Sequence, residues 1–220
     1  MDSRKIKVAQ IEHDGQTFAV KYRDEFVGNT MEETHQFWEI DFLEKVAKLY
    51  PIHKTIVDIG AHIGSAALYF KHFLKPKRLI AIEPAQDNYM FLVQNVPGAI
   101  YLKMALSNRN GEGYLWNRLE TVNAGTYQLG DQGEPITLRT LDSLNLDDVT
   151  LIKIDVEEHE REVLEGGMGT IKRCKPIILL ELHKPVNTPE FHRWVQQELG
   201  YKFHESCPFY CDINAILEPA

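Results

Sequence analysis

The chain has 220 residues, of which 44% are hydrophobic and 25% are charged, and its formal net charge is −8. This length favours a single domain, residues 1–220, with a sizeable core. No apolar run is long enough to cross a bilayer, and residues 2–5 are polar, so we expect no membrane partner and no signal peptide. The acidic balance argues against a nucleic-acid partner. Three cysteines, an odd number, fit a reducing compartment, and we expect a cytoplasmic protein.

Residues 1–50 are predicted to form a β-hairpin and a helix ahead of the main fold. Residues 5–23 alternate around the turn signal Asp14–Gly15. Residues 31–49 have the spacing of an amphipathic helix, which Pro51 follows. Glu39 lies early in that helix, either as part of a packing surface or as a residue lent to a site that begins just downstream.

Residues 51–220 alternate between apolar strands and helical segments, which is typical of a parallel sheet with crossover helices. Strands are expected at 55–59, 78–84, 99–106, 150–155 and 176–183, and an antiparallel pair at 201–204 and 214–217 completes the sheet. Residues 112–140 break this pattern with two short strands around a polar, glycine-rich segment. This hairpin insertion either covers a site or projects from the surface.

The central motif, residues 55–68, has the pattern of a buried strand, a glycine turn and a helix start. Gly60 and Gly64 give the backbone the freedom that such a turn requires. A dinucleotide fingerprint has a middle glycine that admits a pyrophosphate, and here His62 stands at that position. The turn therefore disfavours a dehydrogenase and suits a ligand without a pyrophosphate, such as S-adenosylmethionine. The amides of the helix start would face its carboxylate, and Asp58 its ammonium.

A second buried strand ends in Glu83 and Pro84, about 20 residues beyond the glycine turn, where a carboxylate accepts both hydroxyls of a ribose. The third strand leads through Ser107 into a turn near which the adenine edge would lie. The residues expected to bind the cofactor are Glu39, Asp58, Gly60, His62, Gly64, Ser65, Glu83, Pro84, Ala105, Leu106, Ser107 and Asp155.

Four of the expected strands end in acids, and the carboxyl ends of parallel strands meet at one crevice. Asp58 and Glu83 would serve the cofactor. The groups left for an acceptor molecule are Asp155 and Glu181, with Glu158, His159 and His183 nearby.

These motifs together resemble the FkbM family of S-adenosylmethionine-dependent methyltransferases, over residues 37–183. The resemblance rests on VDIGAHIG (57–64), AIEP (81–84), ALS (105–107), LDSL (141–144) and above all IKIDVEEHE (152–160) with VLEG (163–166). It implies an α/β fold, a Rossmann-like class I methyltransferase sheet that is mostly parallel with an antiparallel C-terminal strand. It also implies O-methylation, commonly of sugar or natural-product hydroxyls. His62 stands where the family usually has asparagine, and Glu158 where it usually has glycine.

An alcohol must lose its proton as the methyl group arrives, so a general base is expected within hydrogen-bond reach. The candidates are Asp155, His159 and His183, and Glu158 adds a carboxylate beside the acceptor. A second route is metal-assisted, with Mg²⁺ or Mn²⁺ held by Asp155, Glu181 and His183. The sequence leaves both routes open.

The sequence thus predicts an S-adenosylmethionine-dependent O-methyltransferase whose partner is a small-molecule or glycan hydroxyl acceptor, with a sugar favoured. Two alternatives stay open. One is a nucleic-acid 2′-hydroxyl methyltransferase, for which Lys153 beside Asp155, with Glu181 later, is the supporting pattern. The other is a catalytically silent Rossmann-like binding module.

Overall fold

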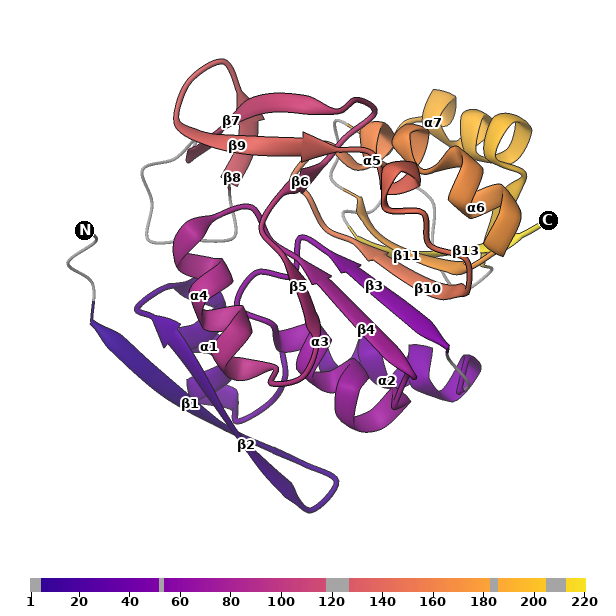
Figure 1. The fold of residues 1–220 in the computed structure, drawn as a ribbon. Coiled ribbons are helices and arrows are strands. Elements are labelled where there is room, and N and C mark those ends of the chain that lie inside the picture. Colours follow the sequence, from indigo (N-terminus) through magenta and orange to yellow (C-terminus); the bar gives the residue numbers. More distant parts are fainter. Residues whose placement is uncertain (1–4, 52–53, 118–126, 183–185, 205–212) are drawn as a thin grey trace.

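The computed structural model describes residues 5–51, 54–117, 127–182, 186–204 and 213–220. Its centre is a seven-stranded sheet in the order β12-β13-β11-β10-β3-β4-β5 (Figure 1). The strands from β5 to β11 are parallel, and β13 is antiparallel to both of its neighbours. This confirms the predicted mostly parallel sheet with an antiparallel C-terminal strand. The strands are β3 (Thr55–Ile59), β4 (Arg78–Ile82), β5 (Ile100–Leu102), β10 (Val149–Ile154), β11 (Ile177–Leu182), β12 (Tyr201–Phe203) and β13 (Ile213–Pro219).

Helices cover both faces of this sheet (Figure 1). Neighbouring residues of a strand pack into different hydrophobic clusters, Ile56 into one and Val57 into the other, so the strands are apolar throughout. Within the described ranges, no helix has the length and apolar character needed to cross a membrane. One face of the sheet carries α3 (Ser65–Tyr69), which a π-helical turn (Phe70–Leu74) extends, and α4 (Gln86–Asn95). The other face carries α5 (Glu160–Gly166), α6 (Met168–Cys174) and α7 (Pro189–Trp194), and a second π-helical turn (Val195–Leu199) extends α7.

The predicted N-terminal hairpin is confirmed as β1 (Ile6–His13) and β2 (Gln16–Arg23). Asp14 and Gly15 both have positive φ, 48° and 69°, as a two-residue hairpin turn requires. Ala9 and Ile11 of this hairpin belong to the same hydrophobic cluster as β3, so the hairpin packs on the main fold.

The single helix predicted over residues 31–49 is wrong, because the structure has α1 (Phe26–Thr34) and α2 (Ile40–Leu49). The carboxylate of Glu25 accepts the first free N–H groups of α1, so this helix starts before residue 31. It ends where His35 adopts φ 57°. The link that follows is held at residue 65, where the helix after β3 begins, since the N–H of Trp38 donates to Ser65 Oγ at 3.2 Å.

The strand predicted over residues 99–106 is split between two sheets. Its first part, β5, stays in the large sheet, and β6 (Ala105–Leu106) joins a small sheet in the order β6-β9-β7-β8. The two short strands expected within residues 112–140 are β7 (Gly111–Asn117) and β9 (Glu134–Arg139), and β8 (Tyr127–Gly130) was not predicted. The small sheet lies above the carboxyl ends of β3 and β4 (Figure 1).

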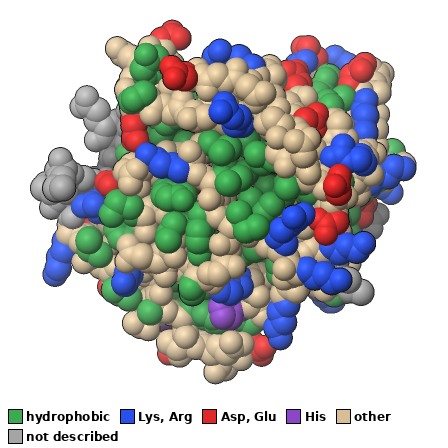
Figure 2. Space-filling model, in the orientation of Figure 1, with side chains coloured by type: hydrophobic (Ala, Val, Ile, Leu, Met, Phe, Trp, Pro, Cys, Tyr) green, Lys and Arg blue, Asp and Glu red, His purple; other side chains and the backbone are tan. Residues whose placement is uncertain are grey.

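Hydrophobic side chains gather between α4 and α6 on the face seen in Figure 2. The edge strand β5 runs through this part of the molecule in Figure 1, and its Ile100 is 45% exposed.

Between β5 and β10 the described residues form no α-helix, so the crossover there is made by the small sheet and a 3₁₀ turn (Leu141–Leu144).

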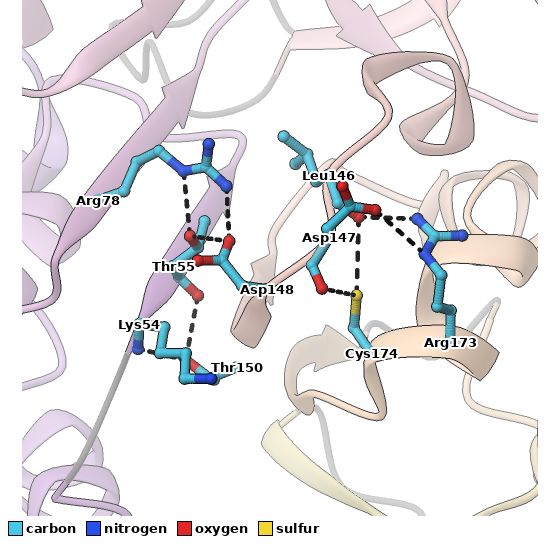
Figure 3. Close-up of polar contacts among 9 residues, drawn as sticks. All are labelled: Lys54, Thr55, Arg78, Leu146, Asp147, Asp148, Thr150, Arg173 and Cys174. Atoms are coloured by element: carbon cyan, nitrogen blue, oxygen red, sulfur yellow. Dashed lines mark hydrogen bonds and ion pairs between the residues drawn. The ribbon is translucent and has the colours of Figure 1, made fainter.

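Polar contacts fix the amino ends of the central strands, opposite to the acids (Figure 3). Asp148 accepts from Thr55 Oγ1 at 2.7 Å and from Arg78 Nη2 at 2.6 Å. The Arg78 Nε also donates to Thr55 Oγ1, at 3.1 Å. Nearby, Arg173 Nη2 donates to the carbonyl of Leu146 at 2.7 Å. These contacts tie β3, β4 and the segment before β10 together at the end where no ligand is expected.

Candidate functional site

A cavity of about 320 Å³ lies at the carboxyl ends of the central strands. The order of the strands reverses between β3 and β10, and open α/β sheets bind ligands at this switch point. The cavity thus stands where the sequence predicts the site. The predicted residues that line it are Glu39, Asp58, Gly60, His62, Ser65, Glu83, Pro84, Ala105, Leu106, Asp155, His159 and Glu181.

Three other predicted residues do not line the cavity. A Cβ atom on Gly64, which has φ 94°, would lie 2.6 Å from Val96 Cγ2, so this glycine serves the packing of the turn. Ser107 lies behind the wall, with its Oγ 3.0 Å from Nε2 of His159. Glu158 does not reach the cavity, although its neighbour Glu157 does. His183 lies outside the described residues.

The glycine turn brings β3 and β10 close together. Gly60 has φ 78°, and a Cβ atom on it would lie 1.7 Å from the Asp155 carbonyl oxygen, so only glycine fits. The N–H of Asp155 donates to the carbonyl of Ile59 at 3.0 Å, which continues the parallel pairing into the turn. His62 has φ 51°, a left-handed conformation that asparagine and histidine adopt more readily than most residues.

Glu83 is held at the end of β4 by the turn. Its carboxylate accepts from the N–H of His62 and from the N–H of Ala85, both at 2.9 Å. Burial raises its pKa to about 7 in spite of these bonds. The acid is therefore oriented and buried at the position predicted for ribose binding.

Asp58 is fully buried at the end of β3. Neither of its carboxylate oxygens has a hydrogen-bond partner of ordinary geometry among the described residues, although the N–H of Ala67 lowers its pKa. Burial raises its pKa to about 6, although the ammonium of Lys153 lowers it. An unpaired buried acid costs stability, which is typical of a group that a ligand satisfies.

Lys153 supplies the cation of the site. It is 6% exposed, and its Nζ lies 2.7 Å from Asp155 Oδ2. Burial alone would lower the pKa of Lys153, but Asp155, Asp58, Glu39 and Glu181 together raise it. Burial likewise opposes the charge on Asp155, yet Lys153 lowers the pKa of Asp155 overall. Burial and the nearby charge of Asp155 raise the pKa of Glu181, which donates its proton to Asp155 in a hydrogen bond.

The proposed metal ligands are only partly placed. In the part of the chain that the structure describes, no group of three or more His, Cys, Asp or Glu side chains is arranged to hold a metal ion. Asp155 and Glu181 lie instead around the ammonium of Lys153. Because His183 is not described, the set of Asp155, Glu181 and His183 stays a prediction.

Several lining residues were not predicted. They include Lys153, whose pattern beside Asp155 was assigned to a nucleic-acid alternative, and an apolar wall with no local sequence signal. The residues of this wall come from distant parts of the chain and meet only through long-range packing. The unpredicted lining residues are Phe26, Val27, Trp38, Ile59, Ala61, Ala66, Ile82, Asn88, Met104, Leu115, Tyr127, Leu129, Lys153, Val156 and Glu157.

The sheet order and the cavity define the chain as a Rossmann-like α/β protein with a cavity at the switch point. Residues 58–203, more than half of the chain, match the model of the methyltransferase FkbM domain. The chain therefore belongs to the FkbM methyltransferase family, as its motifs predict.

The chain is also similar to two proteins of known name. The hexuronic acid methyltransferase AglP of Haloferax volcanii is 23% identical over 175 residues, which are 72% of this chain and 71% of that protein. The crystal structure of methyltransferase FkbM from Methylobacillus flagellatus has a TM-score of 0.55 at 18% identity, and it covers 75% of this chain. The match covers 43% of that protein, so this chain spans less than half of its length. The likeness confirms the predicted methyltransferase fold.

Replacing Asp58 by asparagine is expected to stabilise the ligand-free protein at high pH. The pKa of Asp58 is raised from 3.8 to about 6 by folding, so the native state binds more protons than the unfolded state between these values. This group therefore costs stability as pH rises through that window. Asp58→Asn should gain about 2–3 kcal/mol at pH 8 and nothing at pH 4, by urea unfolding. Asp131→Asn, in an exposed turn, is the control. An equal gain at both pH values would contradict the assignment.

Replacing Glu158 by glycine is expected to raise stability. Glu158 has φ 73° and Glu157 has φ 52°, so two successive non-glycine residues are left-handed. Glycine adopts this conformation without steric cost, and Glu158→Gly should gain about 0.5–1 kcal/mol in denaturant unfolding. Glu158→Ala removes the carboxylate but keeps the strain, and it should gain nothing. An equal gain in stability by both variants would contradict this prediction, because it would assign the gain to the loss of the carboxylate rather than to relief of backbone strain.

Proposed function

We propose that the protein is an S-adenosylmethionine-dependent O-methyltransferase that acts on a sugar or glycan hydroxyl. The observation that carries this proposal is the pair Asp58 and Glu83, which end neighbouring strands and face one cavity in a chain of a methyltransferase family. The named activity of the Haloferax volcanii relative on a hexuronic acid supports a sugar acceptor.

The residues present fit S-adenosylmethionine. Glu83 is oriented by two backbone N–H groups and can accept from ribose hydroxyls. The unpaired oxygens of Asp58 suit the ammonium of the methionine end. Apolar side chains beside Glu83 offer a surface for an adenine ring: these are Ile82, Met104, Ala105 and Leu106.

Asp155 is the best placed general base. When bound, S-adenosylmethionine supplies a methyl group activated by its sulfonium. Asp155 lies in the cavity, and Lys153 keeps it ionised, so it can accept the proton of an acceptor hydroxyl as the new C–O bond forms. His159 is less suitable, because its Nε2 faces Ser107 at 3.0 Å and its Nδ1 faces Glu162 at 3.5 Å. Asp155 therefore faces the cavity in its charged form, with Lys153 beside it, whereas both ring nitrogens of His159 face other side chains.

The nucleic-acid alternative gains little from this arrangement. Lys153 is already paired with Asp155, and the other ionisable side chains in the described lining are six carboxylic acids, two histidines and Tyr127. An acidic lining of this kind would repel the phosphate groups of a nucleic acid.

Removing the Glu83 carboxylate is expected to abolish cofactor binding. Two charge-assisted hydrogen bonds to a ribose contribute about 1.5–3 kcal/mol each, so Glu83→Ala should weaken S-adenosylmethionine and S-adenosylhomocysteine binding at least 100-fold in calorimetry. Glu112→Ala, exposed on β7, should bind as the wild-type protein does. No binding to the wild-type protein would contradict the proposal. Binding without transfer to any hydroxyl acceptor would favour the silent binding module.

A further inference from the structure

The cavity has a second wall, distinct from the part that suits a nucleoside. Asp58, Glu83 and the apolar residues of β4 and β6 form one part. The wall away from them comes from α1 and the link to α2, through Phe26, Val27, Trp38 and Glu39. If the first part holds the cofactor, this wall is left for the acceptor.

Contacts from distant residues fix the conformation of this wall. Trp38 is fixed by the hydrogen bond of its N–H to Ser65 Oγ, across 27 positions of sequence. Glu39 has φ 57°, which residues other than glycine rarely adopt, and Nδ2 of Asn214 donates to its Oε1. Backbone strain that is held by distant contacts is typical of functional positions.

An aromatic pair stands at this wall. Phe26 is 56% exposed although it lines the cavity. Its ring meets that of Trp38 edge to face, with centroids 5.8 Å apart and planes at 76°. The pair therefore presents apolar surface to a ligand, and the C–H face of a pyranose ring has the matching character.

The charge around the cavity is strongly one-sided. Among the described lining residues, the carboxylic acids are Glu39, Asp58, Glu83, Asp155, Glu157 and Glu181, and the only lysine or arginine is Lys153, already paired with Asp155. Carboxyl groups can hydrogen-bond to hydroxyl groups, and the described lining has no lysine or arginine left over to pair with an anionic ligand. An uncharged acceptor fits this field, and an acceptor that carries a carboxylate does not.

We propose that Phe26, Val27, Trp38 and Glu39 form the acceptor subsite, and that it selects an uncharged pyranose over a hexuronate. This inference rests on the proposed methyltransferase function. It names a preference that differs from the hexuronic acid substrate in the name of the Haloferax volcanii relative.

The test uses two probes that differ only at C6, methyl β-D-glucopyranoside and methyl β-D-glucuronide. Saturation-transfer NMR at pH 7.5, with S-adenosylhomocysteine bound, should show transfer to the glucoside at least fivefold stronger than to the glucuronide. Phe26→Ala should reduce the glucoside signal at least fivefold and leave S-adenosylhomocysteine affinity within twofold of the wild-type value. Tyr114→Ala, whose exposed ring does not line the cavity, should change neither. Glu39→Gln should raise the glucuronide signal relative to the glucoside signal.

The outcomes separate the two proposals. Wild-type protein that binds no S-adenosylhomocysteine would overturn the proposed function and this inference together. Wild-type protein that binds it, yet shows no transfer to either glycoside, equal or stronger transfer to the glucuronide, or a glucoside signal unchanged by Phe26→Ala, would overturn this inference alone.

Discussion

At Gly60 the turn after β3 passes the carbonyl of Asp155 so closely that a Cβ atom would lie 1.7 Å from the oxygen. This contact requires glycine, and it allows β3 and β10 to stay paired up to the point where the strand order reverses. Asp58 and Asp155 consequently lie on the two sides of one crevice. The turn can then present the N–H of His62 to Glu83, which directly follows the next strand. The whole acidic edge of the sheet depends on this approach.

The same close approach places several acidic side chains together, and only some of them are neutralised or hydrogen-bonded. Lys153 neutralises Asp155 at 2.7 Å, and Glu181 keeps its proton. Asp58 is left buried without a hydrogen-bond partner among the described residues. Such a group lowers stability, and proteins accept this loss mainly where a ligand completes the site. At the opposite end of the strands, Asp148 binds Thr55 and Arg78, and the polar groups there are satisfied.

Local features of the sequence were enough to predict the central strands and their acids. The strand that ends in Asp58 and the strand that ends in Glu83 are continuous apolar runs, and the glycine turn marks which ends meet. What failed depends on contacts between distant residues. The helix predicted over residues 31–49 is interrupted between His35 and Glu39, and the link there is held by Ser65 and Asn214, which bind Trp38 and Glu39 from 27 and 175 positions away. Residues 99–106 are apolar apart from Lys103, and this single break did not reveal that β6 would join another sheet.

The most direct test of the central claim is a crystal structure of the protein grown with S-adenosylhomocysteine. The account predicts the ribose hydroxyls on the Glu83 carboxylate and the amino group at Asp58, with the wall of Phe26 and Trp38 still open to solvent. A ligand bound elsewhere, or one whose ribose lies away from Glu83, would contradict the assignment of this cavity.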